Sequence, residues 1–341
     1  MLLSQRPRRP ALLAQARWTT LVLLVLPGAA LVCMPPVQMT PPSADAPAEE
    51  VALSGAAAMI GAGDIGVCNG TGDDSTAAIV DSVLKADSVA GVEHVVFTVG
   101  DNAYPAGTTL QFARCFGTSW GDTTRRIMKW IRPALGNHEY QTMSATPYFT
   151  YFGDRAGERG KGYYAYDIGE WRAIVLNSEI LPLSSLDPEN ESDQGTWLRA
   201  ELEDQPTKCT VAYFHRPLWS SGFHGGHADM RTVFQMLHAA GVDLVLAGHE
   251  HHYERFAPMT PDGVVDTVGG ITQIVIGTGG AALRGLRMPV AANSLAQVQG
   301  HHGVLKLTLG AGAWRSAFID VQGRVWDRSG GTCHQPLAET R

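Results

Sequence analysis

The sequence has few charged residues and few cysteines, and its charges do not predict a strongly basic surface. Only 17% of the 341 residues are charged and 45% are hydrophobic, which excludes disorder, a coiled coil or a collagen-like structure for the whole chain. Lys and Arg number 26 against 33 Asp and Glu, a net charge of −7. A polyanion such as DNA would be repelled by that charge, so nucleic-acid binding is not expected.

The N-terminal apolar run is too short for a membrane span. Residues 1–17 are basic, and the apolar segment Leu21–Val32 that follows falls short of the roughly 20 residues that a bilayer requires. This pattern predicts a signal peptide over 1–33 and a secreted or extracytoplasmic protein. An uncleaved membrane anchor is the alternative, and lipidation of Cys33 stays open. Residues 34–51, rich in Pro and Ala, are predicted to form a linker.

Beyond Cys33 the chain has only four cysteines, and none lies in a C-x-x-C pair. A thiolate metal site is therefore not expected, whereas an even number outside the cytoplasm favours two disulfides. Four cysteines allow three pairings. We favour Cys68–Cys115 together with Cys209–Cys333, of which the second would tie the C-terminal tail to the body.

Short apolar segments alternate with helical or loop segments from residue 52 onward, and no internal repeat interrupts them. This alternation predicts one α/β domain over 52–333, followed by a tail over 334–341. After Gly303 the residues alternate between apolar and polar, which predicts a terminal antiparallel section. The predicted strands are Ala57–Ala62, His94–Val99, Ala173–Asn177, Thr210–Phe214, Leu244–Ala247 and Gln273–Ile276, and the predicted helices are Thr76–Asp87 (capped by Asp73, Asp74 and Ser75), Gln194–Asp204 and Ala228–Ala240.

Five short segments contain residue types that bind metal ions, and four of them directly follow a predicted strand. In an open α/β sheet, side chains at the carboxyl ends of strands gather in one crevice. Carboxylate, phenolate, amide and imidazole groups are ligands for hard or borderline cations. Each segment alone is weak evidence, but their joint occurrence predicts a metal site. The segments are Gly63-Asp64-Ile65-Gly66, Gly100-Asp101-Asn102-Ala103-Tyr104, Gly136-Asn137-His138-Glu139, Ala212-Tyr213-Phe214-His215 and Gly248-His249-Glu250-His251.

With these motifs, residues 55–330 resemble the metallophosphoesterase (calcineurin-like) superfamily, and within it the purple acid phosphatases, including small secreted bacterial members. The superfamily opens with Asp-x-His, whereas this chain has Gly66 in place of that His and Tyr104 three residues after Asp101. This exchange of imidazole for phenolate distinguishes purple acid phosphatases. The resemblance implies a four-layer α-β-β-α sandwich of two mixed sheets.

Carried over position by position, the resemblance implies two metal ions bridged by Asp101. One ion would be bound by Asp64, Asp101, Tyr104 and His251, and the other by Asp101, Asn137, His215 and His249. His249 and His251 are two apart on an extended segment and point the same way, so Glu250 between them is expected to point away. A phenolate suits Fe(III), so we expect Fe(III) with a divalent ion (Fe, Zn or Mn).

The expected reaction is hydrolysis of a small phosphate monoester by a metal-bound hydroxide attacking in line with the leaving alcohol. No Gly-x-Ser-x-Gly motif suggests a side-chain nucleophile. His138 is expected to bind the phosphate and protonate the leaving group. His224, in the loop Ser220–His227, is a second candidate, since a similarly placed His in plant relatives lies just outside the metal ligands. His227 is a weaker one.

Two alternative functions remain open on the sequence. A phosphodiesterase acting on small diesters would use the same metals and differ in its loops, chiefly Leu181–Asp193 and Ser220–His227. A more distant alternative is a non-catalytic surface protein that keeps the metals for stability. Glu254 and Arg255 are expected to pair with each other behind the site. The sequence does not indicate the oligomeric state.

Overall fold

The computed structural model describes residues 53, 56–180, 192–204 and 209–334. The predicted signal peptide 1–33, the linker 34–51, Cys33 and most of the loop 181–193 lie outside these residues. Within the described ranges, no helix combines the length and apolar character needed to cross a bilayer. The described residues all belong to one compact unit.

Two mixed sheets form the centre of this unit. The first has the strand order β13-β12-β11-β1-β2-β3 and the second β10-β8-β9-β7-β6-β5-β4. In the first sheet β1, β2 and β3 are parallel, and in the second β5, β6, β7 and β9 are parallel. The strands are β1 Ala57–Ala62, β2 His94–Val99, β3 Ile131–Ala134, β4 Tyr164–Ile168, β5 Trp171–Val175, β6 Cys209–Tyr213, β7 Leu244–Ala247, β8 Tyr253–Phe256, β9 Thr272–Ile276, β10 Ser294–Val298, β11 Gly303–Gly310, β12 Ala313–Asp320 and β13 Val325–Thr332.

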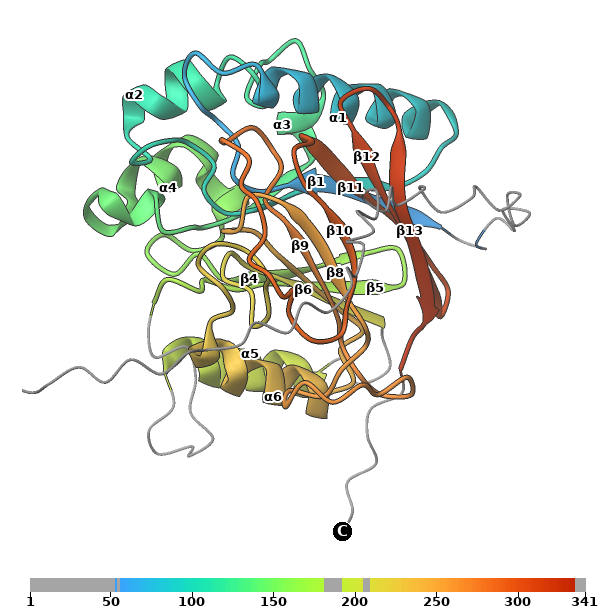
Figure 1. Ribbon diagram of the computed structural model, residues 1–341. Coiled ribbons are helices and arrows are strands. Elements are labelled where there is room, and N and C mark those ends of the chain that lie inside the picture. Colours follow the sequence, from blue (N-terminus) through green and yellow to red (C-terminus); the bar gives the residue numbers. More distant parts are fainter. Residues whose placement is uncertain (1–52, 54–55, 181–191, 205–208, 335–341) are drawn as a thin grey trace, which may run out of the picture. The chain divides into compact units, whose positions relative to one another are not determined.

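Helices cover the outer faces of the two sheets, giving the predicted four-layer α-β-β-α arrangement. Figure 1 shows α1 and α3 on one side of the sheets and α5 and α6 on the other. A π-helical turn, Phe112–Phe116, continues α2. The α-helices are α1 Gly72–Val89, α2 Thr109–Gln111, α3 Ile127–Trp130, α4 Thr146–Phe152, α5 Asp193–Asp204 and α6 Arg231–Ala239.

The main core lies between the two sheets. Phe97 of β2 packs on Tyr213 of β6, with ring centroids 5.9 Å apart. The buried indole of Trp171 in β5 donates a hydrogen bond to the carbonyl of Gly310 in β11, at 2.9 Å. A second apolar cluster joins the second sheet to its covering helices, for example through Phe234 of α6. Strands covered on both faces explain the nearly continuous apolar runs of the sequence.

Most of the predicted elements are confirmed, with differences at their ends. β1, β2 and β7 have the predicted bounds, whereas β5 begins two residues earlier than predicted, at Trp171. Helix α1 begins at Gly72 after Thr71, so Asp73, Asp74 and Ser75 lie in its first turn rather than acting as its cap. The predicted helix 228–240 divides into a 3-10 turn, Ala228–Met230, and α6. The terminal antiparallel section is β11–β13.

Both favoured disulfides are present. Cys68 pairs with Cys115, and Cys209 pairs with Cys333. The second bond links β6, in the second sheet, to the residue that follows β13, in the first sheet.

Candidate metal centre

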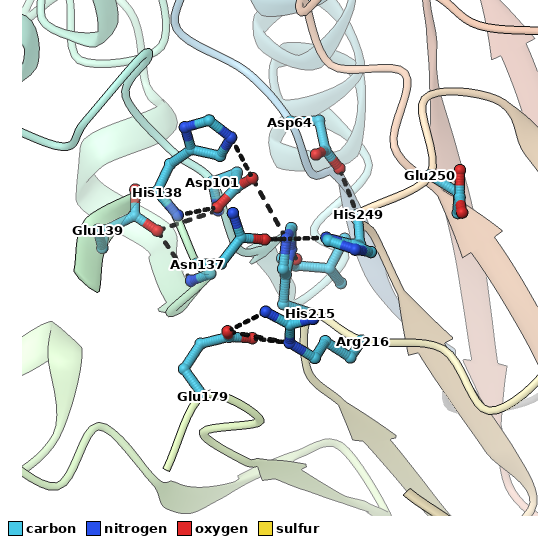
Figure 2. Close-up of polar contacts among 12 residues, drawn as sticks. Asp64, Asp101, Asn137, His138, Glu139, Glu179, His215, Arg216, His249 and Glu250 are labelled. Atoms are coloured by element: carbon cyan, nitrogen blue, oxygen red, sulfur yellow. Dashed lines mark hydrogen bonds and ion pairs between the residues drawn. The ribbon is translucent and has the colours of Figure 1, made fainter. Parts of the chain in front are cut away.

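The candidate site is built where parallel strands of both sheets end. Asp64 follows β1, Asp101 follows β2 and Asn137 follows β3, all in the first sheet. His215 follows β6 and His249 follows β7, in the second. Figure 2 shows the side chains of these residues directed toward one another. The convergence of carboxyl ends predicted from the sequence is therefore present, with each sheet supplying part of the set.

Three of these residues have left-handed backbone conformations. The φ angles are 57° at Asp64, 51° at Asp101 and 70° at His249. Such conformations cost about 1–3 kcal/mol each and persist only where the surroundings hold them. Hydrogen bonds do so here: the amide of Asp64 donates to the carbonyl of Gly100 at 3.0 Å, and the amide of His249 donates to Asp64 Oδ2 at 2.9 Å.

The Tyr104 hydroxyl is the centre of a first cluster. It lies 2.7 Å from Asp64 Oδ1, 3.0 Å from Asp101 Oδ2 and 3.2 Å from His251 Nε2. Nδ1 of His251 lies 2.7 Å from the carbonyl of Ala282, which can only accept, so Nδ1 carries the proton of the neutral ring. Nε2 is then a lone pair facing the cluster. With the ring neutral, one phenolic proton thus faces three acceptors. Burial favours this neutral ring, but Asp64, whose Oδ1 lies 3.2 Å from Nε2, raises the pKa of His251.

His215 is the centre of a second cluster. Its Nδ1 lies 2.8 Å from the carbonyl of Val99 and carries a proton for the same reason. Its Nε2 faces Asp101 Oδ2 at 3.3 Å, Asn137 Oδ1 at 3.2 Å and His249 Nδ1 at 3.2 Å. Asp101 lies in both clusters, and the carboxylate and imidazole atoms of Asp64, Asp101 and His215 lie within 4.8 Å of one another.

The electrostatics of the site favour added positive charge. Burial alone would lower the pKa of His215, but Asp101 raises it to about 10. Burial likewise opposes ionisation of Asp101, but the adjacent His215 and His138 lower its pKa. Burial, followed by the charges of Asp101 and Asp64, raises the pKa of the Tyr104 hydroxyl well above its usual range. A cation among these groups would take the place of the proton on the Tyr104 hydroxyl and stabilise the tyrosine in its ionised form.

The residues present therefore fit a cation site. Hard oxygen donors from two carboxylates, one phenol and one amide stand beside imidazole nitrogens, the donor set of transition metals with carboxylate and histidine ligands. Two buried imidazoles orient their second nitrogen by hydrogen bonds to backbone carbonyls, as metal-binding histidines do.

Glu139 was not among the site residues predicted from the sequence. Its fully buried carboxylate accepts hydrogen bonds from the backbone amides of Asp101 (3.0 Å), Asn102 (2.7 Å) and Gly136 (2.8 Å), and so joins the turns after β2 and β3. Its place in the Gly136–Glu139 motif was visible in the sequence, but its backbone partners were not. We assign it a positioning role.

His138 lies at the edge of the cluster with a fixed orientation. Its backbone amide donates to Asp101 Oδ1 at 2.8 Å, and its Nδ1 contacts the carbonyl of Pro105. Its Nε2 is 3.7 Å from Asp101 Oδ2, and its ring packs 4.4 Å from that of Tyr104. Because a carbonyl fixes the proton on Nδ1, Nε2 is the nitrogen directed at the site.

His224 packs on the site rather than within it. Its half-exposed ring lies 4.7 Å from the ring of His249, and the ring of His227 lies 4.9 Å from the same His249 ring. Glu250 Oε1 accepts hydrogen bonds from the amides of His224 (2.5 Å) and Gly225 (2.8 Å). Glu250 therefore points away from the ligand cluster, as expected, and holds this loop (Figure 2).

The predicted pairing of Glu254 with Arg255 is wrong. Adjacent residues of strand β8 point to opposite faces, so the two side chains find separate partners. Arg255 forms an ion pair with Asp327 of β13 at 2.7 Å, whereas Glu254 accepts hydrogen bonds from Ser221 and Ser294. Arg216, directly after His215, pairs with Glu179, as Figure 2 shows.

Cys209, Asp243 and Cys333 form a second group of potential ligands. Cys209 and Asp243 lie at the starts of β6 and β7, at the opposite ends of these strands from His215 and His249. The two sulfur atoms of the group are bonded to each other, so neither is a thiolate.

Comparison with known proteins supports the same reading of the motifs. A family model described as calcineurin-like phosphoesterase matches residues 60–253, more than half of the chain. Purple acid phosphatase 18 of Arabidopsis thaliana is 31% identical over 167 residues, which are 44% of this chain and 36% of that protein. Purple acid phosphatase 21 of the same plant is 29% identical over 213 residues, 58% of this chain and 44% of the relative. The chain thus spans less than half the length of these relatives.

Solved structures agree in fold. Purple acid phosphatase PPD1 from yellow lupin (Lupinus luteus) seeds aligns with a TM-score of 0.67 at 20% identity, over 82% of this chain and 54% of the other. GAP50, the anchor in the inner membrane complex of Plasmodium, aligns with a TM-score of 0.63 at 14% identity, over 83% of this chain and 90% of the other. At these identities the likeness shows the fold alone.

Proposed function

We propose that this chain, which belongs to the calcineurin-like phosphoesterase family, is a dinuclear-metal hydrolase that acts on phosphate monoesters in the manner of a purple acid phosphatase. The observation that carries the proposal is the pair of donor clusters that share Asp101. Both clusters contact the same oxygen, Asp101 Oδ2, and a carboxylate shared in this way can bridge two ions roughly 3.5–4 Å apart.

In this proposal each donor cluster binds one ion. Asp64, Asp101, Tyr104 and His251 bind the first, and Asp101, Asn137, His215 and His249 the second. The contacts that support this division are those of the Tyr104 hydroxyl and of His215 Nε2. Because a phenolate is a hard anionic donor, we propose Fe(III) in the first position and divalent Fe, Zn or Mn in the second.

Two bound cations would neutralise the charge of the phosphate group and lower the pKa of a water molecule beside it. The chain's own residues then orient the ester and supply a proton. His138 Nε2 faces the cluster while Nδ1 stays bonded to Pro105, so a protonated ring holds its second N–H toward a bound phosphate oxygen. From this position His138 binds the phosphate and donates the proton to the departing oxygen.

We propose a smaller role for His224. Burial, together with nearby Arg284, outweighs the effect of Glu250 and lowers the pKa of His224. A neutral imidazole at the edge of the site donates one hydrogen bond without adding charge. It therefore helps to orient the ester and does not serve as the principal acid. Burial, followed by the charge of nearby Arg216, lowers the pKa of His227, and we give this residue no part in the reaction.

The enzyme claim is tested with purified protein and an aryl phosphate. We expect hydrolysis with an acidic to neutral pH optimum, loss of activity when a chelator removes the metals, and recovery on adding iron and zinc. Activity that survives complete metal removal would contradict the proposal.

His138→Ala tests the proton donor. A phenolate with electron-withdrawing groups leaves without help, whereas an alkoxide requires a proton. The variant should therefore lose at least tenfold more kcat on an alkyl phosphate than on p-nitrophenyl phosphate. His301→Ala, at a partly exposed histidine outside the motifs that faces Asp320, is the control. Equal losses on both substrates would remove the acid role from His138.

A diesterase with the same metals is the second candidate. Two loops would decide between monoesterase and diesterase activity. Loop 220–227 is described, whereas residues 181–191 of the other loop lie outside the described residues. Comparing rates on bis-p-nitrophenyl and mono-p-nitrophenyl phosphate decides, since a diesterase is faster on the first. A non-catalytic surface protein would show a chelator-dependent melting temperature without turnover of either ester.

We further propose that the protein works outside the cytoplasm. Two disulfides support this, since they persist in oxidising compartments. Fractionation of the producing cells, with N-terminal sequencing of the recovered protein, tests both the location and cleavage near residue 33.

A further inference from the structure

A cavity of about 400 Å³ lies outside the candidate metal centre, between edge strands of the two sheets. Strand β3 is at the edge of the first sheet and β4 at the edge of the second, so each has a free side. None of the predicted metal ligands lines the cavity. Its lining includes Arg132 of β3, Asp154 and Arg155 of the turn before β4, and Tyr164 and Tyr166 of β4.

Two arginines give this cavity a positive charge. Within the part of the chain that the structure describes, neither Arg132 nor Arg155 lies within ion-pair distance of a carboxylate, whereas Arg172 of β5 pairs with Asp167 and Glu201. Asp154 is exposed and is the one acidic residue of the lining, so two arginines and one aspartate leave a net charge of +1. The whole chain has a net charge of −7. A small anion is therefore attracted to this place, and a singly charged one matches it.

The guanidinium of Arg132 is held in place by a ring and a carbonyl. It lies 5.6 Å from the centre of the Tyr166 ring, within the range of a cation–π contact. Its Nη1 donates a hydrogen bond to the carbonyl of Ile131 at 3.2 Å. This bond uses one of the several N–H groups that a guanidinium carries, and the planar arrangement of the others matches the two oxygens of a carboxylate.

The tyrosine hydroxyls beside Arg132 already donate to other groups of the protein. Tyr164 donates to the carbonyl of Pro133 at 2.8 Å. Tyr213 of β6 donates to the carbonyl of Arg132 at 3.0 Å, so Tyr166 is the donor in its 3.1 Å contact with the Tyr213 hydroxyl. The rings of Tyr164 and Tyr166 lie 6.3 Å apart with an angle of 28° between their planes. These two residues therefore offer a ligand ring surface rather than protons.

We propose that this cavity is a second ligand site, which binds a small aromatic acid: a flat ring that carries one carboxylate. Arg132 binds the carboxylate and Arg155 adds positive charge, while the ring packs on Tyr164 and Tyr166. The volume is that of a small-molecule site and is larger than an inorganic ion fills. The inference does not depend on the proposed hydrolase function.

Calorimetric titration of the purified protein with benzoate tests the proposal. Acetate has the carboxylate without the ring, and benzyl alcohol has the ring without the charge. Each should bind at least about tenfold more weakly than benzoate, because the site is built for both groups together. Absence of benzoate binding to the wild type, or equal affinity for acetate or benzyl alcohol, would overturn the proposal.

Variants show where benzoate binds. Arg132→Gln removes the charge that faces the carboxylate and should reduce the affinity for benzoate about tenfold. Arg155→Gln, at an exposed residue of a turn, should reduce it about threefold. Arg159→Gln is the matched control, because this exposed arginine donates to Thr150 and does not line the cavity, and its affinity should equal that of the wild type.

Circular dichroism confirms that each variant is folded before it is titrated. Benzoate affinity that is unchanged in a folded Arg132→Gln would place the ligand elsewhere, for example on the metal ions, and would overturn the proposal. If Arg132→Gln does not fold, unchanged affinity in Arg155→Gln has the same meaning. An equal loss in Arg159→Gln would show a general effect of charge and would also overturn the proposed site.

Discussion

At the scale of single residues, Gly66 and Tyr104 both differ from the general superfamily pattern, and the structure explains why the two differences occur together. A Cβ on Gly66 would lie 2.7 Å from the carbonyl oxygen of Asn102 and 2.9 Å from the amide of Phe116. A histidine at residue 66, as in the general superfamily pattern, therefore has no space. The hydroxyl of Tyr104 instead reaches the place beside Asp64 and Asp101.

Tyr104→Phe should remove the visible absorption that we expect from the protein. In our proposal the colour arises from charge transfer between the phenolate and ferric iron, which Phe lacks. Visible spectra and metal analysis of both proteins provide the measurement. Tyr140→Phe is the matched control, because Tyr140 donates no group to the donor clusters and contacts Asn177 instead. Colour retained in Tyr104→Phe would contradict the assignment of Tyr104 to iron.

The sequence was sufficient to predict that these residues lie together. It did not show which contacts hold them in place. The order of Asp, Tyr, Asn and His at strand ends predicted the cluster, since topology places such residues at one edge. The positive φ angles of Asp64, Asp101 and His249 depend on hydrogen bonds between distant turns. Local sequence carries no signal for such bonds. The ligand roles themselves stay a prediction.

At the scale of elements, β3 is one of four strands, with β4, β8 and β10, that the sequence did not predict. Its four residues, Ile131–Ala134, include an arginine and a proline and so lack the apolar run of the other strands. A proline is tolerated because β3 is the edge strand of its sheet and its free side needs no ladder partner. The Asn137 motif therefore does follow a strand, although the sequence did not show it.

Gly136→Ala should separate the turns after β2 and β3. A Cβ at this position would lie 2.4 Å from the amide nitrogen of Asp101, which is backbone and cannot move aside cheaply. We expect a loss of roughly 1–3 kcal/mol in the free energy of unfolding and a reduced metal content. Urea denaturation and metal analysis measure the two effects.

Gly285→Ala is the control for this change, since its Cβ would make an ordinary contact of 3.5 Å with Gln299. If Gly136→Ala were as stable as that control and bound as much metal, the close approach of the two turns would not be needed for stability or for metal binding.

At the scale of the whole molecule, Asp243 links the second sheet to the C-terminal end of the described chain. Its buried carboxylate accepts hydrogen bonds from the amides of Thr210 (2.8 Å) and His334 (2.6 Å). Burial raises the pKa of Asp243 from 3.8 to about 7, despite these hydrogen bonds. The folded protein therefore keeps a proton that the unfolded chain has already lost between those pH values.

It follows that this group makes the protein more stable in acid. As the pH rises from about 4 to 7, the contribution of Asp243 to the free energy of unfolding should fall by at most about 1.4 kcal/mol per pH unit. Asp243→Asn resembles the protonated acid and should lack this dependence. The difference between wild type and variant, measured by urea denaturation across this range, should shift in favour of the variant as pH rises. A constant difference would contradict the raised pKa.

The Cys209–Cys333 bond affects how the protein unfolds. It joins β6 of one sheet to the end of β13 in the other, and each sheet supplies part of the donor set. Separation of the sheets would pull apart Asp64 and Asp101 on one side and His215 and His249 on the other. A covalent bond across that division limits how far the two sheets can move apart and so opposes their separation. Thermal denaturation and metal release should then occur in one step, and a reductant should divide them into two.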